Sequence, residues 1–427
     1  MAHMSKALRG WLSVATACGM LAALVGCGSA PQANRPTPAA ATTASATPTV
    51  VAAGPSPSAR SDADLPVAIL VHQELPNAYG ISTATSYSVV LVAADGSIAA
   101  RVNPRLSSPV VMTYQNCPVI GRSPMPTCQI PFRPRAPLVT SSDTRAYFLD
   151  GDSDVGYLTP DGHTGTAVHL PVSPRVRYAV AVSPDDSRIA VAAFDYKGSS
   201  TFGNPGVTMN LFVQDLAGGN RVNLFSSTSV TEWPIGWHNG HLVIAVGPAG
   251  PVQYTVENPY FAVEGYHVAN ATTGVRVATV GTGDDCNRGP VARAGAACYL
   301  NRYSAIGYRS WDGVGHVFAP WHDFGPSPTA LAPNGSRLAG SNLGPPVDSH
   351  INLVSVSGTN QLDVKGIVQG WLDDEHLVYF AVPSNRSLIL DLVTGVSAAV
   401  PQTNPPGRPD SPDAYLQFLG TVPQQMS

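Results

Sequence analysis

Four of the six cysteines in this chain have a spacing that suits covalent cross-linking. Cys117 and Cys128 form one local pair, and Cys286 and Cys298 form another. Zinc sites need thiolates about two to four residues apart or histidines close by, and neither pair fits that pattern. Each disulfide would close a loop of about a dozen residues and stabilise the fold by about 3 kcal/mol in the chain-entropy account. Four cysteines allow three pairings, and we expect the local one, with two disulfides of the kind that persist in exported proteins.

A short acidic run could bind a cation. Asp150, Asp152 and Asp154 have the Asp-x-Asp-x-Asp spacing with which a calcium loop begins. The glutamate expected at about the twelfth position of such a loop is replaced by Asp161. Aspartate and glycine between two strands are also ordinary turn residues. The run thus predicts either a structural calcium ion or a plain turn without any cofactor.

Other residues that could bind a ligand occur singly. His238 and His241 have the spacing of two metal ligands, but the Asn239-Gly240 pair between them is a strong signal for a tight hairpin turn at the surface. Tryptophans near strand starts are typical of a core. Trp311 and the triplet Trp321, His322 and Asp323 are nevertheless the positions at which we would first look for a binding surface. No Gly-x-Ser-x-Gly nucleophile motif occurs, which argues against serine-hydrolase chemistry.

The N-terminus resembles an export signal. Lys6 and Arg9 precede an uncharged run from Trp11 to Val25, which is shorter than the about 20 apolar residues of a membrane-spanning helix. The run ends in Leu-Val-Gly-Cys27, a tetrad that resembles the lipobox of bacterial lipoproteins. The resemblance implies that the signal peptide is removed and that the Cys27 sulfur carries a diacylglycerol with palmitate-type chains. A retained membrane helix is the alternative interpretation.

Three segments follow from this interpretation. Residues 1–26 are the lipoprotein signal peptide, with a start at either Met1 or Met4. Residues 27–63 are rich in proline, alanine, threonine and serine, so we expect a disordered tether that holds the rest away from the lipid surface. Residues 64–427 form the folded domain. The mature protein would be exported and anchored by lipid to the outer face of the bacterial cell membrane.

Composition points to an all-β domain. Charged residues make up only 12% of the 427 residues, against about 25% in ordinary domains, and glycine and proline are abundant. Short apolar runs alternate with turn signals along the folded part, a pattern typical of many short strands. The formal net charge of −4 leaves no basic stripe for phosphate groups, so nucleic acid is not an expected partner.

The strand pattern repeats. Val180 to Ala192, with Ser-Pro-Asp-Asp-Ser-Arg at its centre, has a close copy in Ala330 to Ala339 with Ala-Pro-Asn-Gly-Ser-Arg. Gly236-Trp237 and Gly370-Trp371 begin two variant copies. Periods of roughly 35 to 55 residues are typical of β-propellers. The units resemble the TolB-like and WD40-like β-propeller repeats of bacterial exported proteins, which implies four-stranded blades around an axis.

We expect a single propeller of seven blades, with six or eight as alternatives. The predicted blades span residues 65–105, 137–171, 176–226, 230–281, 288–320, 327–366 and 367–401, with 106–136 as a long loop stapled by the first cysteine pair. The first blade lacks an opening strand, which residues 414–422 at the C-terminus could supply. Closing the ring with both ends removes an exposed sheet edge.

The most direct functional interpretation is binding without catalysis. We expect a surface module or scaffold at the cell envelope for a protein, peptide or glycan partner. An envelope glycan- or peptide-acting enzyme, with its site at the mouth of the propeller channel, is the alternative, and it would need acidic and basic side chains converging there. A solute-sensing or quinone-dependent propeller is a third reading, without direct support in the sequence.

Overall fold

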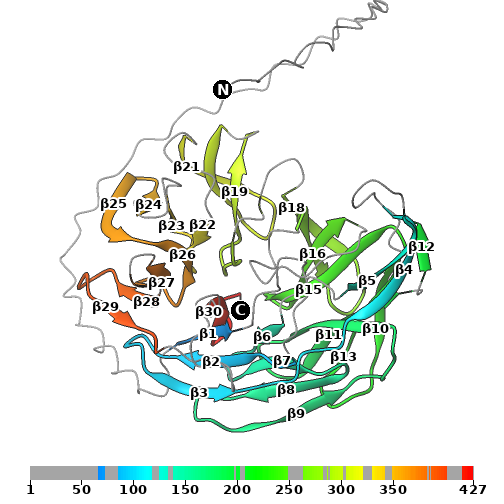
Figure 1. Ribbon diagram of the computed structural model, residues 1–427. Coiled ribbons are helices and arrows are strands. Elements are labelled where there is room, and N and C mark those ends of the chain that lie inside the picture. Colours follow the sequence, from blue (N-terminus) through cyan, green and yellow to red (C-terminus); the bar gives the residue numbers. More distant parts are fainter. Residues whose placement is uncertain are drawn as a thin grey trace, which may run out of the picture. The chain divides into compact units, whose positions relative to one another are not determined.

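Figure 1 shows the computed structural model of the chain, which divides into Met1–Ala59 and Arg60–Ser427. The described residues all lie in the second unit. They are residues 66–72, 85–117, 125–132, 138–196, 199–201, 207–248, 263–281, 286, 289–301, 304–320, 329–341, 349–381, 384, 386–401 and 416–426. These residues form strands and no α-helix. None of them belongs to a helix with the length and apolar character that crossing a bilayer requires.

Seven antiparallel sheets are arranged as blades in a ring, which confirms the predicted propeller. Each blade is named here from its innermost strand outward. Blade 1 consists of β30 (Leu416–Val422), β1 (Val67–His72), β2 (Ser88–Val92) and β3 (Ile98–Val102), and blade 2 of β6 (Val139–Ser141), β7 (Ala146–Asp150), β8 (Asp154–Leu158) and β9 (Thr164–His169). Blade 3 consists of β10 (Val176–Val182), β11 (Arg188–Tyr196), β13 (Val207–Asp215) and β14 (Val222–Ser227). Blade 4 consists of β15 (Val230–His238), β16 (His241–Pro248), β17 (Gly265–Asn270) and β18 (Arg276–Val280).

The remaining blades complete the ring. Blade 5 consists of β19 (Ala296–Leu300), β20 (Ala305–Arg309) and β21 (Gly315–Pro320). Blade 6 consists of β22 (Thr329–Leu331), β23 (Arg337–Ser341), β24 (His350–Ser355) and β25 (Gly358–Lys365). Blade 7 consists of β26 (Ile367–Trp371), β27 (His376–Ala381), β28 (Arg386–Asp391) and β29 (Ser397–Ala399). Blade 5 has three strands among the described residues. An isolated bridge between Ala292 and Gly295 lies where the other blades have an innermost ladder.

The C-terminal strand closes the ring as predicted. β30 pairs antiparallel with β1, with Val67 opposite Val422 and His72 opposite Leu416. The innermost strand of blade 1 therefore comes from the end of the chain and the other three come from its start. This arrangement removes the free edge that an unpaired β1 would leave beside the axis.

The expectation of a loop over residues 106–136 was wrong for part of that segment. β4 (Val110–Cys117) and β5 (Met125–Phe132) pair as an antiparallel hairpin, and β12 (Ser199–Thr201) adds to β4 in parallel. β-branched and aromatic residues such as Val110, Val111 and Tyr114 favour extended backbone, and pairing satisfies its polar groups. Residues 118–124 between the two strands lie outside the described part.

The repeated Pro-Asp and Pro-Asn motifs form the same turn in two blades. Asp186 (φ 59°) in blade 3 and Gly335 (φ 73°) in blade 6 take the left-handed conformation at matching positions. The residue before each one caps the turn, because the Asn334 side chain accepts a hydrogen bond from the Ser336 amide at 2.8 Å and Asp185 accepts one from the Ser187 amide at 3.1 Å. The motif therefore specifies a tight turn between the first two strands of a blade.

The core lies between neighbouring blades. Apolar side chains on the two faces of each sheet pack against the adjacent sheets, as blades 1 and 2 do through Val89 and Phe148. Small residues of blade 3, including Ala181 and Ala190, pack against large side chains of blade 4, including Trp237. A small face opposite a large one fills the space between wedge-shaped blades without voids. The packed interfaces thus fix the directions in which the loops at both ends of the ring project.

Candidate functional site

The ring has two faces with different connections. Because neighbouring strands in a blade are antiparallel, the turns after the first and third strands lie at one end, which we call the tight-turn face. It consists of residues 93–97, 142–145, 159–163, 183–187, 216–221, 239–240, 271–275, 293–295, 310–314, 332–336, 356–357, 372–375 and 392–396. The opposite end, the long-loop face, includes the described residues 85–87, 103–117, 125–132, 138, 151–153, 170–175, 199–201, 228–229, 263–264, 281, 286, 289–290, 301, 304, 349, 366, 384 and 400–401.

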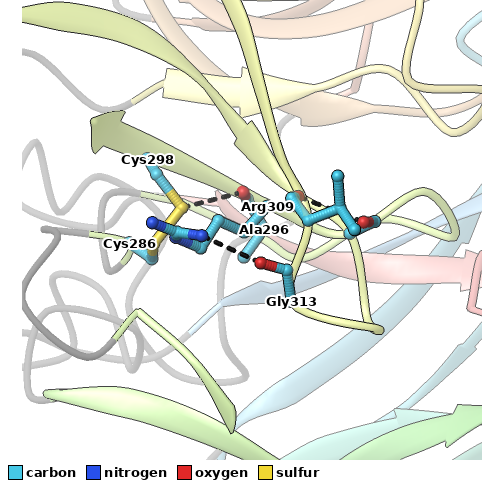
Figure 2. The surroundings of a disulfide bond; sticks show 7 residues. Cys286, Ala296, Cys298, Arg309 and Gly313 are labelled. Carbon is cyan, nitrogen blue, oxygen red and sulfur yellow. Dashed lines mark hydrogen bonds between the residues drawn. A yellow bond between two sulfur atoms is a disulfide. The ribbon is translucent and has the colours of Figure 1, made fainter. Parts of the chain in front are cut away.

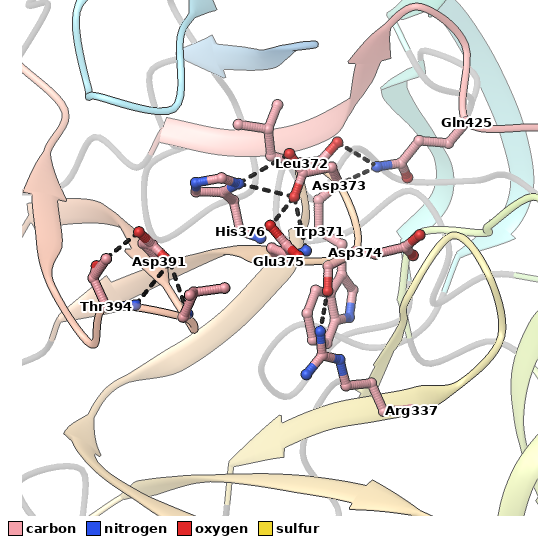
Figure 3. A network of polar contacts seen from close by, with 11 residues as sticks. Arg337, Trp371, Leu372, Asp373, Asp374, Glu375, His376, Asp391, Thr394 and Gln425 are labelled. Atoms are coloured by element: carbon pink, nitrogen blue, oxygen red, sulfur yellow. Dashed lines mark hydrogen bonds and ion pairs between the residues drawn. The ribbon is translucent and has the colours of Figure 1, made fainter. Parts of the chain in front are cut away.

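Turns of neighbouring blades are bonded to each other on the tight-turn face. The Asp143 amide of blade 2 donates to the Pro184 carbonyl of blade 3 at 3.0 Å, and the Ala294 amide of blade 5 donates to Pro333 of blade 6 at 3.1 Å. Figure 3 shows part of a third link, in which Arg337 of blade 6 donates to the Asp374 carbonyl of blade 7. These bonds use backbone groups that a partner would otherwise contact.

Two tryptophans strengthen the same face. The Trp371 indole donates to the Ala330 carbonyl of the preceding blade at 2.9 Å, and the Arg337 guanidinium lies 5.3 Å from its ring centroid. Trp237 lies under Arg188 in the same way, 5.9 Å away. Both arginines come from the Ser-Arg step of the repeat and both tryptophans from a Gly-Trp step. Cation–π contact and burial together fix one blade against the next.

The long-loop face holds a cluster of ionisable side chains near blade 2. Asp150, Asp152 and Asp154, predicted as calcium ligands, lie there at the ends of β7 and β8. Asp150 accepts hydrogen bonds from the Arg105 amide at 2.8 Å and from its Nε at 3.0 Å. The His169 ring lies 2.9 Å from Asp154. Asp150 and Asp154 therefore both have partners within the chain.

Asp152 joins this group to blade 3. Its Oδ1 accepts from the Ser108 amide at 2.7 Å and lies 3.7 Å from the buried Arg177 Nε, which donates to the Ser108 carbonyl at 2.7 Å. No cluster of three or more potential metal ligands is present in the part of the chain that the structure describes. Calcium at the aspartates stays a prediction, which chelation can test.

A second ionisable group lies between blades 3 and 4. Glu232, near the long-loop end of β15, is 1% exposed, and its Oε1 accepts from Arg276 Nη2 at 2.5 Å. Its other oxygen, Oε2, is buried without a hydrogen-bond partner among the described residues. Burial raises the pKa of Glu232, against the opposing effect of Arg276. A carboxyl group that resists ionisation can hold a proton at higher pH than usual.

His267 of β17 completes that group. Its Nε2 lies 3.8 Å from Glu232 Oε1. Burial, and then the charge of Arg276, lowers the pKa of His267 to about 4. The imidazole is therefore neutral at pH 7, and its contact with Glu232 is not an ion pair there. A protonatable carboxyl, a neutral imidazole and a guanidinium lie together, which is a combination able to transfer protons.

Sequence reasoning missed these three residues. Glu232, His267 and Arg276 come from three different strands of one blade, and only the register of the sheet brings them together. The single available signal was a glutamate inside an otherwise buried strand, because glutamate is almost never fully buried without a partner.

One predicted disulfide is present. Figure 2 shows the Cys286–Cys298 bond, with Cα atoms 4.0 Å apart. It joins the 281–290 connection to β19, beside the position where blade 5 lacks a described innermost strand. Gly281 (φ 88°) passes close by, since a Cβ there would lie 3.4 Å from the Cys286 sulfur. The bond therefore holds Cys286 against a blade in which the described residues form only three paired strands.

The other predicted residues divide into buried and undescribed ones. Trp311 is 3% exposed, donates its indole hydrogen to the Ala292 carbonyl at 3.0 Å and meets the Tyr266 ring edge-on, so it packs in the core. Trp321, His322, Asp323 and Cys27 lie outside the described residues, as do the side chains of Cys117 and Cys128. Along the β4–β5 ladder Cys117 is opposite Met125, and Cys128 is opposite Tyr114. Binding at the aromatic positions and the bond between those two thiols stay predictions.

The Asn239-Gly240 pair forms the hairpin turn that the sequence predicted. His238 and His241 are opposite each other at the end of the β15–β16 hairpin, and both Asn239 (φ 48°) and Gly240 (φ 75°) are left-handed. Two left-handed central residues are the mark of a two-residue hairpin turn.

Comparisons with known proteins were made by sequence and by structure. No family model matches the sequence, and no curated protein matches it. Among solved structures, TolB from Acinetobacter baumannii is 12% identical over 71% of this chain and 65% of its own, with a TM-score of 0.35. BamB from Moraxella catarrhalis is 14% identical, covering 81% and 89%, with a TM-score of 0.35. An oligogalacturonate lyase in complex with manganese is 10% identical, covering 78% and 89%, with a TM-score of 0.41.

Proposed function

We propose that this protein is an exported lipoprotein, lipidated at Cys27, whose propeller binds a protein, peptide or glycan at the cell envelope through its long-loop face. The difference between the two faces carries the proposal. Short turns that are bonded to the turns of neighbouring blades make up the tight-turn face, whereas the long-loop face carries longer connections, among them the β4–β5 hairpin. Binding residues are concentrated on loops that a rigid scaffold positions.

The place where the tether joins the domain supports this orientation. β1 begins at Val67, opposite Val422 at the end of β30, and both residues lie at the tight-turn face. A tether from Cys27 would therefore attach to that face. Attachment there would leave the long-loop face free of the tether, so an envelope partner could reach it.

Crosslinking in cells tests the binding face. A photoreactive amino acid at Asp152 or Ser304 on the long-loop face should give one crosslinked product with an envelope component. The same amino acid at Val314 or Val356, both exposed on the tight-turn face, should not. Equal crosslinking from the two faces, or from neither, would refute the assignment.

Metabolic labelling tests the anchor. The wild-type chain should incorporate labelled palmitate and fractionate with membranes. The Cys27→Ser chain should lose the label and leave the membrane fraction, whereas Cys18→Ser should behave as the wild type does. Membrane retention of the Cys27→Ser protein at its full, uncleaved length would instead favour the retained helix.

An enzyme is the second candidate, and the Glu232, His267 and Arg276 group favours it. Acid–base cleavage of a glycan needs a carboxyl group that holds a proton near neutral pH, and burial raises the pKa of Glu232 in that direction. The test is release of reducing ends from purified cell-wall glycan by the full chain. Loss of that release in Glu232→Gln, with unfolding behaviour unchanged, would support catalysis. Absence of turnover in the wild type would leave binding as the function.

A further inference from the structure

The last described residues of the chain continue beyond the closing strand. After β30 ends at Val422, residues Pro423–Met426 pair with no strand, yet Gln424 is 7% exposed and Met426 is 4% exposed. Burial of a terminal segment without ladder bonds requires specific contacts, because chain ends are otherwise poorly ordered.

Those contacts lie on opposite sides of the ring. Gln425 Nε2 donates to the Trp371 carbonyl and, at 3.1 Å, to the Leu372 carbonyl of blade 7, as Figure 3 shows. The next residue, Met426, accepts through its carbonyl from His238 Nδ1 of blade 4 at 3.0 Å. Blade 4 is three blades away from both blade 7 and blade 1, so the segment crosses the axis at the tight-turn face.

The blade 4 side is shaped to receive the segment. Gly236 has no side chain where a Cβ would lie 2.7 Å from Met426 Sδ and 3.1 Å from Gln424 Nε2. Methionine is flexible and polarisable and fits an irregular apolar recess well. The glycine is thus a recess for the methionine rather than a requirement of its own backbone.

His238 adds a directional contact. Its Nδ1–H donates to Met426, and its Nε2 lies 2.8 Å from Asn239 Nδ2, which donates to it. One nitrogen donates and the other accepts, so the ring is neutral. Burial, as the largest cause, lowers the pKa of His238, which favours the same state. The ionisable groups nearby are Arg293, His241 and Asp312.

We propose that the tight-turn face contains a peptide-binding site which the chain fills with its own C-terminal segment. The site takes a short, turned peptide through three elements. They are the paired carbonyls of Trp371 and Leu372 for a glutamine amide, the imidazole of His238 for a backbone carbonyl, and the recess at Gly236 for a methionine. This site is separate from the long-loop face, so it does not depend on the function proposed above.

Competition in trans tests the proposal. A chain that ends at Pro423 keeps β30 and empties the site. We expect the labelled peptide Thr-Val-Pro-Gln-Gln-Met-Ser to bind it saturably by fluorescence anisotropy and to raise its melting temperature, because a ligand of the native state stabilises that state. The complete chain should show neither effect, since its site is filled.

Two substitutions in the chain that ends at Pro423 locate the contact. Gly236→Ala should weaken peptide binding about fivefold, since overpacking by one methyl costs about 1 kcal/mol. Gly315→Ala is the matched control and should leave binding unchanged, because a Cβ there would lie 3.6 Å from its nearest neighbour. Equal weakening by both substitutions would overturn the assignment.

Three further outcomes of these experiments would count against the proposed peptide site or require a second variant. Saturable binding to the complete chain as strong as to the shortened one, or none to a folded shortened chain, would overturn the proposal. If the shortened chain does not fold, full-length Met426→Asp, which expels the side chain from the recess, takes its place. If neither chain folds and added peptide restores neither, the segment is an integral part of the fold and the proposal is wrong.

Discussion

The tight-turn face and the long-loop face lie at opposite ends of the same strands but differ in their contacts. On the first, the Pro-Asp turn, the Arg–Trp contact and the C-terminal segment all connect one blade to another. On the second, charged residues such as Glu232 and Asp152 are held by partners from neighbouring elements, and the connections vary in length. Repetition at one end therefore supplies rigidity, while the other end is free to carry residues that the repeat does not need.

The largest effect should come from the tight-turn face. Trp371→Ala removes a side chain that is 1% exposed and leaves a cavity under Arg337, so we expect a loss of about 3–5 kcal/mol in the free energy of unfolding. Urea denaturation followed by circular dichroism measures it. Val172→Ala, at a residue 79% exposed on the long-loop face, is the control and should stay within about 0.5 kcal/mol. A loss below about 1 kcal/mol in Trp371→Ala would contradict the structural role given to this face.

The disulfide gives the next largest effect. Cys286→Ser with Cys298→Ser should lower the free energy of unfolding by about 3 kcal/mol, because the unfolded chain regains the freedom of a closed loop. Hydrogen exchange should rise in β19 and stay unchanged in β27 of blade 7. Reducing agent should destabilise the wild type and leave the double variant as it was. Uniform exchange in all blades would show that the bond does not act locally on blade 5.

Acid should weaken the interface of blades 3 and 4. The pKa of His267 is lowered from 6.5 to about 4 in the fold, so its contribution to stability is complete above pH 6.5 and is lost as the pH falls through 4. We expect a loss on the order of 2 kcal/mol between pH 7 and pH 4 that His267→Gln does not show. The raised pKa of Glu232 has the opposite effect on stability. Its contribution is complete below pH 4.5, the ordinary pKa, and decreases as the pH rises above that value.

Denaturation at a series of pH values separates the two groups. His316→Gln, at an exposed histidine on β21, is the matched control and should keep the wild-type dependence. Parallel curves for the wild type and His267→Gln would mean that the buried imidazole is not the group that titrates.

The smallest effect concerns the aspartates. Arg177 and the Ser108 amide already pair with Asp152, so we expect Asp152→Asn to cost about 0.5–1 kcal/mol and chelator to leave the melting temperature unchanged. Calcium titration followed by differential scanning calorimetry is the measurement. Stabilisation of the wild type by calcium, absent in Asp152→Asn, would establish the metal site instead.

The sequence was sufficient to predict the features that repeat. The Ser-Pro-Asp and Ala-Pro-Asn turns, the Gly-Trp steps and the C-terminal strand predicted seven blades closed by residues near Val422, because local turn chemistry and strand period specify each unit. The Asn239-Gly240 turn was predicted for the same reason.

Features that depend on distant contacts were out of reach. The proximity of Glu232, His267 and Arg276 follows from the ladder register, and a shift of one residue would turn each side chain to the other face. The path of Gln425 and Met426 across the axis depends on blades that are far away in sequence. The β4–β5 hairpin was not predicted, because the many prolines of segment 106–136 favour a loop over a strand.

The pairing of Val67 with Val422 has a consequence for synthesis. A ribosome must release nearly the whole polypeptide before the first blade can acquire its innermost strand, so the circle stays open throughout elongation. Contacts between such distant positions also form slowly. A chain that lacks β30 would leave β1 with an unpaired edge beside the axis, although every other blade keeps its strands.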